Sequence, residues 1–218
     1  MYKKLIMSCM AVAALAAFAL PATASAVTTT DATGDVKVGA SITTKNIGDL
    51  FFMRTDGVTP EVTCTTVHAT GTVVQNSGGV SIDQFTTFKV SSTGAVSPHN
   101  GLNECTAGIG NAWVTVVNLP LTLTTIAGTD NFNITGKEGK KVRFIIGSTV
   151  AGECEYESTN AAITGAFTTA ATTVLSINNT QAGSGSKLIR GGFFCPTSGQ
   201  LKGSSYIQTT NGEEIASS

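Results

Sequence analysis

Four cysteines in the body of the chain constrain its fold more than any other feature of the sequence. Cys64 and Cys105 lie 41 residues apart, and Cys154 and Cys195 repeat that separation. An even number of cysteines in an exported protein indicates a disulfide framework. Four cysteines allow three pairings, and the sequence alone leaves them open. We expect Cys64 to pair with Cys105 and Cys154 with Cys195, because each bridge then closes one unit of the chain.

The equal separations also suggest an internal repeat. Two copies of one unit, offset by 90 residues, would cover residues of about 60–110 and 150–206. Each first cysteine is followed by a glycine that opens an alternating stretch, at Gly71 and at Gly165. Residue identity between the two copies is low, so coincidence is the alternative explanation.

The first 26 residues have the three parts of a secretory signal peptide. They are the positive dipeptide Lys3-Lys4, an apolar run over residues 5–20, and the small-residue site Ala24-Ser25-Ala26. We expect cleavage after Ala26, which leaves a secreted β domain over residues 27–218. The apolar run is shorter than the roughly 20 residues that span a bilayer, so no membrane insertion is expected. The predicted location is the periplasm, the cell surface or the medium.

Charge and composition narrow the class of partner. Two of the 13 basic residues leave with the signal, so 11 basic and 14 acidic residues remain and the formal net charge is −3. Neither nucleic acid nor an anionic membrane is therefore an electrostatically favoured partner. Glycine and threonine are abundant, which favours tight turns and strands over helices.

Short alternating runs separated by turn signals predict an all-β protein. Residues 36–42 alternate apolar and polar side chains, and more than ten further runs of this kind follow. Such spacing is typical of an antiparallel β-sandwich or a barrel-like fold. Residues 161–171 are the one helix candidate, which Gly165 and the surrounding threonines disfavour.

The sequence contains few candidates for catalytic or metal-binding residues. The histidines after the signal are His68, in a strand-like run, and His99, in a turn, and no Gly-x-Ser-x-Gly nucleophile turn accompanies them. Glu153, Glu155 and Glu157 share one strand face, which we interpret as a solvated acidic edge, with a calcium or catalytic role as the alternative. The cysteines lack the paired spacing of a zinc site. The sequence therefore predicts no enzyme activity, no cofactor and no metal.

Aromatic residues supply the candidate contact positions. Trp113 is the single tryptophan and lies in an apolar run, so core packing is its main interpretation and a ligand contact the alternative. Phe51-Phe52 and Phe193-Phe194 are adjacent pairs, and in a strand one ring of each pair faces away from the core. We take Trp113, together with Phe52 and Phe193 or their neighbours in each pair, as candidate contact residues.

Several marks together resemble a group of uncharacterised secreted bacterial four-cysteine β proteins. The resemblance covers most of the chain after the signal. It implies a secreted β fold and a bacterial source, and it implies no activity. The marks, in order, are Cys64, Gly71, Cys105, Leu119-Pro120, Cys154-Glu155-Tyr156, Cys195 and the run Leu201-Lys202-Gly203-Ser204-Ser205-Tyr206.

The chain is also similar to fimbrial subunits, which are exported β-sandwiches with a disulfide closing a comparable loop. Such subunits polymerise when the N-terminal strand of one completes the sheet of its neighbour. Residues 27–42 are the candidate strand. The second disulfide and the polar residues 211–218 depart from that pattern.

These observations predict a non-catalytic secreted or cell-surface β protein that acts by binding or as a structural component. Its partner is not identified by the sequence, and self-association or a place in the cell envelope fits the pattern. One alternative is a fimbrial or adhesin-like subunit that assembles by strand addition. The other is a small-molecule or glycan-binding module.

Overall fold

A computed structural model describes residues 29–31, 34–54, 60–91, 104–108, 110–150, 152–168, 174–178 and 185–217. Apart from one short 3-10 helix, η1 (Lys137–Gly139), the regular elements are strands, and every pairing between them is antiparallel. The all-β prediction is confirmed. The predicted signal peptide and His99 lie outside the described residues.

Eight strands form a first closed ring, which we call ring 1. Its order is β17-β3-β6-β7-β10-β11-β14-β15, and β15 pairs back onto β17. The strands are β3 (Ser41–Asn46), β6 (Thr66–Ser77), β7 (Val80–Ser91), β10 (Leu121–Thr125), β11 (Asn131–Thr135), β14 (Ile163–Thr168), β15 (Val174–Ile177) and β17 (Ser198–Thr209).

A second closed ring, ring 2, uses the same β17 and seven further strands. Its order is β17-β16-β13-β12-β9-β8-β5-β4, and β4 pairs back onto β17. The further strands are β4 (Leu50–Met53), β5 (Pro60–Cys64), β8 (Glu104–Ala107), β9 (Gly110–Val116), β12 (Arg143–Ser148), β13 (Gly152–Ser158) and β16 (Gly185–Arg190).

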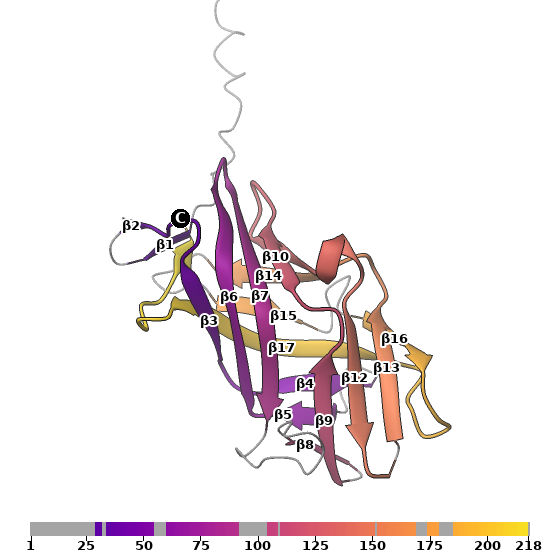
Figure 1. Cartoon of the computed structure of the whole chain (residues 1–218). Helices are drawn as coiled ribbons and strands as arrows, with labels where there is room; N and C mark the ends of the chain where they lie inside the picture. The colour runs from indigo at the N-terminus through magenta and orange to yellow at the C-terminus, as the bar shows by residue number, and fades with distance from the viewer. Residues whose placement is uncertain are drawn as a thin grey trace, which may run out of the picture.

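Strand β17 joins the two rings end to end. Residues 198–202 pair with β16 and β4, whereas residues 203–209 pair with β15 and β3. In Figure 1, β17 runs behind β6 and β7 and reaches the strands of ring 2. One hydrophobic core continues through both rings, with Phe132 in ring 1 and Phe144 in ring 2 among its buried members. The protein is therefore two short barrels on one shared strand.

The order of strands repeats within each ring. In ring 1, moving four places around the ring leads from β3, β6 and β7 to β11, β14 and β15, respectively. In ring 2, the same move leads from β4, β5 and β8 to β12, β13 and β16. By the same move, β10 corresponds to the half of β17 that belongs to ring 1, and β9 corresponds to the half of β17 that belongs to ring 2. The two predicted units each contain one series of this repeat, β5 to β8 and β13 to β16. Their origin by duplication stays a prediction.

A small separate sheet lies beside ring 1, and we call it the terminal cap. It consists of β1 (Thr29–Asp31), β2 (Gly34–Asp35) and β18 (Ala216–Ser217), in the order β18-β1-β2. Figure 1 shows it next to the C-terminus, away from ring 2. Thr29 and Ile215 are buried, so the cap packs on ring 1 through both ends of the chain.

The strand predicted over residues 36–42 is wrong for its first part. Residues 36–40 form a turn in which the amide of Ala40 donates to the carbonyl of Lys37, and Gly39 has a φ of +89°. This turn leaves Val38 at 64% exposure although the alternation predicts it to be buried. A positive φ at glycine reverses the chain without steric cost, so the turn overrides the alternation. The strand begins at Ser41.

Candidate functional site

Both disulfides form with the predicted pairing, and both brace ring 2. Cys64 of β5 bonds to Cys105 of β8, with their Cα atoms 4.7 Å apart, and β5 and β8 are paired neighbours. Cys154 of β13 bonds to Cys195, which follows β16, with a Cα separation of 5.6 Å. All four cysteines are buried. Disulfides of this kind indicate an oxidising environment outside the cytoplasm.

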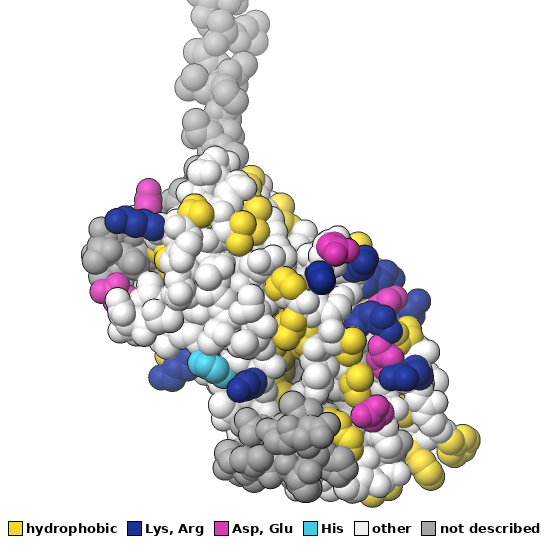
Figure 2. Space-filling model, viewed as in Figure 1, with side chains coloured by type: hydrophobic (Ala, Val, Ile, Leu, Met, Phe, Trp, Pro, Cys, Tyr) yellow, Lys and Arg dark blue, Asp and Glu magenta, His cyan; other side chains and the backbone are white. Residues whose placement is uncertain are grey.

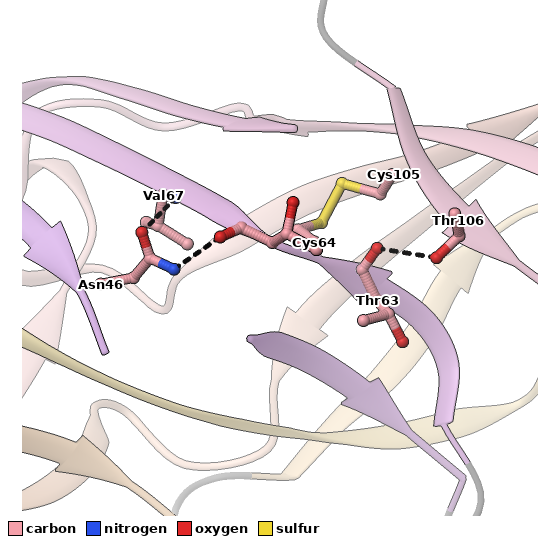
Figure 3. The surroundings of a disulfide bond; sticks show 7 residues. Asn46, Thr63, Cys64, Val67, Cys105 and Thr106 are labelled. Carbon is pink, nitrogen blue, oxygen red and sulfur yellow. Dashed lines mark hydrogen bonds between the residues drawn. A yellow bond between two sulfur atoms is a disulfide. The ribbon is translucent and has the colours of Figure 1, made fainter. Parts of the chain in front are cut away.

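Hydrogen bonds hold the chain on both sides of the first disulfide (Figure 3). The side-chain amide of Asn46 donates to the carbonyl of Thr65 at 2.7 Å, and its oxygen accepts the amide of Val67 at 3.0 Å. The hydroxyl of Thr106 donates to the carbonyl of Thr63 at 3.3 Å. Asn46 belongs to ring 1 and Thr106 to ring 2, so this disulfide lies where the two rings meet.

A cleft on the described surface lies at the mouth of ring 2, and we call it the mouth cleft. Its volume is about 610 Å³. Inward-facing side chains of seven ring strands line it, together with the loop that follows β16. Because a closed ring of eight strands leaves room for one small ligand, its open end is a natural binding position.

Small residues hollow out the wall of the mouth cleft, and aromatic residues form its floor. Ala107 of β8, Ala112 of β9 and Ser148 of β12 lie along the wall. Below them, the ring centroids of Phe52 and Tyr156 are 4.9 Å apart. The aromatic side chains of Phe52 and Tyr156 also contact Phe144 in the core, with centroid distances of 5.9 and 5.6 Å. Bulky residues close ring 2 in its interior, and small residues keep its mouth open.

Two exposed phenylalanines stand at the rim. Phe193 is 96% exposed and Phe194 is 68% exposed, and their rings meet edge to face with centroids 5.7 Å apart. Both line the mouth cleft, as does the exposed Val150. Figure 2 shows hydrophobic side chains projecting at the lower right, where ring 2 ends. The disulfide of the neighbouring Cys195 fixes the base of this loop. It therefore holds the segment that carries the two exposed phenylalanine side chains.

The described titratable groups in the mouth cleft are Arg54, Glu61 and Tyr156, and each has a polar partner. Arg54 and Glu61 form an ion pair across the hairpin of β4 and β5. The Tyr156 hydroxyl donates to the carbonyl of Pro196 at 3.0 Å. Burial, with a smaller contribution from the charge of Glu61, raises the pKa of Tyr156 to about 12. The phenol therefore stays protonated at physiological pH.

The acidic face predicted for Glu153, Glu155 and Glu157 lies outside ring 2, but its interpretation as an edge is wrong. Strand β13 is paired on both sides, with β12 and β16, so it is not an edge strand. Glu155 is buried between Arg143 and Arg190, and it accepts hydrogen bonds from both guanidinium groups. Figure 2 shows charged side chains of both signs gathered over these strands. This face is a network of ion pairs.

The structure separates the three candidate contact residues. Phe52 is buried in the floor of the mouth cleft, and Phe193 stands at its rim. Trp113 is 8% exposed but faces the outer side of ring 2, because its neighbour Ala112 points into the cleft. Its indole packs on Gly147, where an added Cβ would lie 2.1 Å from the ring. Two of the three residues therefore meet at one site, and Trp113 lies across the sheet from it.

Sequence reasoning did not find Tyr156, Ala107 or Ala112 as parts of a site. The two phenylalanine pairs, through Phe52 and through Phe193 with Phe194, were the signals that pointed to this end of the molecule. His68 does not line the cleft; it lies on β6, where its Nδ1 is 3.3 Å from the hydroxyl of Thr43. Within the described part of the chain, no three side chains of His, Cys, Asp or Glu gather as metal ligands would.

Comparison of the chain with protein-family profiles, with curated proteins and with solved structures finds no match in any of the three. Within the described residues, no helix combines the length and apolar character needed to cross a membrane. In the part of the chain that the structure describes, the fold and the site define a disulfide-braced, closed antiparallel β protein with a cleft at the mouth of ring 2.

Proposed function

We propose that this chain is an exported, non-catalytic binding protein that holds an apolar ligand in the mouth cleft. The mouth cleft carries the proposal, since its volume of about 610 Å³ falls among small-molecule sites, which span roughly 300–1,000 Å³. Its charged pair Arg54 and Glu61 and the hydroxyl of Tyr156 have partners within the protein, whereas its floor and rim present aromatic and aliphatic surface. This favours binding over bond-breaking chemistry.

The ligand class follows from the lining. Arg54 and Glu61 neutralise each other, so the described wall offers no uncompensated charge for an ionic ligand. Phe193 and Phe194 offer ring faces on which a flat apolar or aromatic group stacks. The hydroxyl groups of Thr197 and Ser198 supply hydrogen bonding at one side of the cleft. The best fit is a neutral ligand with an apolar or aromatic body and a few hydroxyl or carbonyl groups.

Two features support export. The first 26 residues have the order of a signal peptide, and both disulfides need an oxidising compartment to persist. A protein that meets its ligand outside the cytoplasm benefits from such bracing, because disulfides stabilise the chain without a larger core.

Strand addition is the less supported alternative. A polymerising subunit needs an unpaired sheet edge to accept the donated strand. The described strands of ring 1 and ring 2 each have a paired neighbour on both sides, because β17 closes both circuits. The candidate donor segment also includes Ile42, which is already buried within ring 1.

The test is equilibrium binding of N-phenyl-1-naphthylamine, a neutral apolar fluorophore, to the oxidised protein covering residues 27–218. We expect saturable binding to one site. Replacing Ala107 with Trp fills the wall and should abolish binding, and replacing Phe193 and Phe194 with Ser should weaken it about tenfold or more. The matched control replaces Val38 and Val74, two exposed residues elsewhere, with Ser. Binding that is not saturable, or that survives Ala107→Trp unchanged, would exclude the mouth cleft as the site.

A further inference from the structure

Among the described residues, Asp83 is the one carboxylic acid that is buried inside ring 1. Strand β7 turns Ser81, Asp83 and Phe85 inward, and Asp83 is only 3% exposed. Its neighbours across the sheet are Val73 of β6 and Leu123 of β10, both buried. An apolar residue is the ordinary occupant of such a position, so Asp83 is a departure from the pattern that packs the rest of the ring.

The side chain of Asp83 borders a cavity of about 20 Å³ under the terminal cap. Thr29 of β1 and Ile215, which precedes β18, close the cavity on the cap side. Side chains of β10, β14, β15 and β17 close it from ring 1, and all of them are apolar apart from the hydroxyl of Thr125. None of these described residues is charged, and Glu213 and Glu214 beside Ile215 do not line the cavity.

The polar environment of Asp83 is incomplete. Its Oδ1 is buried and has no hydrogen-bond partner, while the Ser81 side chain serves the carboxyl group. The Ser81 hydroxyl in turn lies 3.5 Å from the Thr29 hydroxyl of the cap. Burial, only partly opposed by the hydrogen bond with Ser81, raises the pKa of Asp83 to about 7. The ionised form would therefore place an uncompensated charge in a buried and mostly apolar site.

Among the described residues, a small number of hydrogen bonds joins the terminal cap to ring 1. The amide of Thr29 donates to the side-chain oxygen of Asn76 at 3.0 Å, and the Asn76 amide donates back to the carbonyl of Thr29 at 2.8 Å. The amide of Ile215 donates to the carbonyl of Ile207 at 2.9 Å. A segment with few buried contacts opens locally at a lower free energy than the barrel does. It is the element that a change at Asp83 would move first.

We propose that Asp83 is a proton-binding site that controls the terminal cap. With the proton bound, Asp83 is neutral, and Thr29 and Ile215 stay packed over it. When the proton leaves, the charged carboxylate favours a state in which the cap has lifted and water reaches the cavity. The cap therefore closes ring 1 in mildly acidic surroundings and loosens as the surroundings become alkaline. This proposal does not depend on the mouth cleft, which lies in ring 2.

The sign of the effect follows from proton linkage. The pKa of Asp83 is about 7 with the cap closed, whereas the ordinary value is 3.8. The closed state thus binds the proton more tightly than an open, hydrated state does. Between these two values the closed state holds more protons, so its stability relative to the open state falls as pH rises, and the loss is complete above about 7.

The test is amide hydrogen exchange at Thr29 and Ile215 in the oxidised protein, read as protection factors at about pH 5.5 and about pH 8.5. We expect protection of both amides to fall about tenfold or more at the higher pH, while the amides of ring 2 keep theirs. Asp83→Asn keeps the shape without a titrating group, so its cap should show no such pH dependence. The control is Asp130→Asn, at an exposed aspartate, which should behave as the wild type.

A second measurement needs no variant and covers the case in which Asp83→Asn fails to fold. The carboxyl carbon of Asp83 in the labelled wild-type protein should titrate near neutral pH in its NMR spectrum. A carboxyl that titrates close to 3.8, or cap protection that does not change with pH, would overturn the proposal. Wild-type pH dependence retained in Asp83→Asn would overturn it as well.

Discussion

The bond between Cys154 and Cys195 joins the inner face of strand β13 to the loop that carries Phe193 and Phe194. Both of these cysteines line the mouth cleft, whereas Cys64 and Cys105 do not. The two bridges have the same separation of 41 residues along the chain. Equal loops give equal chain-entropy contributions, so the bridges differ in what they position and not in the length that they close.

This difference makes the two disulfides matched controls for each other. Replacing Cys154 and Cys195 with Ala should lower the free energy of unfolding by up to about 4 kcal/mol, and replacing Cys64 and Cys105 should cost a similar amount. The first change also frees the base of the Phe193 loop, so it alone should weaken binding of the apolar fluorophore. Urea unfolding and fluorophore titration of both double variants give the two quantities. Equal losses of binding in stably folded variants would contradict this assignment.

The indole of Trp113, the only tryptophan of the chain, packs directly against Gly147. Replacing Gly147 with Ala would place a Cβ 2.1 to 2.4 Å from three indole atoms of Trp113. Overpacking of this kind typically costs about 1–3 kcal/mol, and the displaced indole meets more water. We expect a lower melting temperature and a red-shifted emission. The control is Gly108→Ala, where a Cβ meets nothing within 4 Å; an unshifted spectrum in Gly147→Ala would contradict the placement of Trp113.

Glu155 and Glu157 sit on the same outer face of β13 but differ in burial and in pairing. Glu155 is hydrogen-bonded to Arg143 and Arg190, whereas the Glu157 carboxylate lies 3.8 and 4.0 Å from two lysines. Glu155→Gln should cost about 1–3 kcal/mol of unfolding free energy, since the buried acceptor of two guanidinium groups loses its charge. Glu157→Gln should cost less than about 1 kcal/mol. Chemical denaturation of the two variants measures both losses of unfolding free energy. Equal losses would contradict the difference in burial and pairing between the two glutamates.

The high pKa of Tyr156 makes an optical prediction. Its phenol should ionise only near pH 12, because burial and the nearby Glu61 disfavour the charged form. The folded value exceeds the model-peptide value of 10, so Tyr156 stabilises the fold fully below pH 10 and loses that contribution between pH 10 and about 12. Absorbance of the phenolate against pH should show a late step that Tyr156→Phe removes. An unchanged titration curve in that variant would be evidence against the buried position of this hydroxyl.

The strand content and the disulfides were predictable because they depend on local patterns. Alternation along β10 and β6, glycine-rich turns and an even number of cysteines are each visible in short windows of sequence. The strand prediction was wrong over residues 36–40 because Gly39, with its positive φ, forms a turn that the alternation of side chains does not reveal. The closure of two rings was not predictable, since it depends on β17 pairing with four different strands, and nothing within its 12 residues specifies those partners.

The mouth cleft was beyond sequence reasoning for a related reason. Its wall is made of small residues such as Ala107, Ala112 and Ser148, which carry no chemical signature and come from separate strands. Only Phe52 and Phe193 stood out, because each belongs to an adjacent phenylalanine pair of which a strand would turn one ring away from the core, although Phe193 lies in the loop after β16. Asp83 was missed because an acid within an alternating strand is ordinarily read as facing water, and only the closed ring shows that it faces inward.

Closure of both rings also predicts the assembly state. We expect the oxidised protein covering residues 27–218 to remain a monomer in light scattering as its concentration rises, because its described ring strands have no free edge. Deleting residues 27–42 should abolish cooperative unfolding, since it removes Ile42 from its pairing with both Gly71 and Thr209. Deleting only residues 27–31 removes β1 and should leave both rings folded. If the intact protein instead forms a ladder that the shorter deletion abolishes, β1 is a donated strand, and strand addition replaces ligand binding as the leading function.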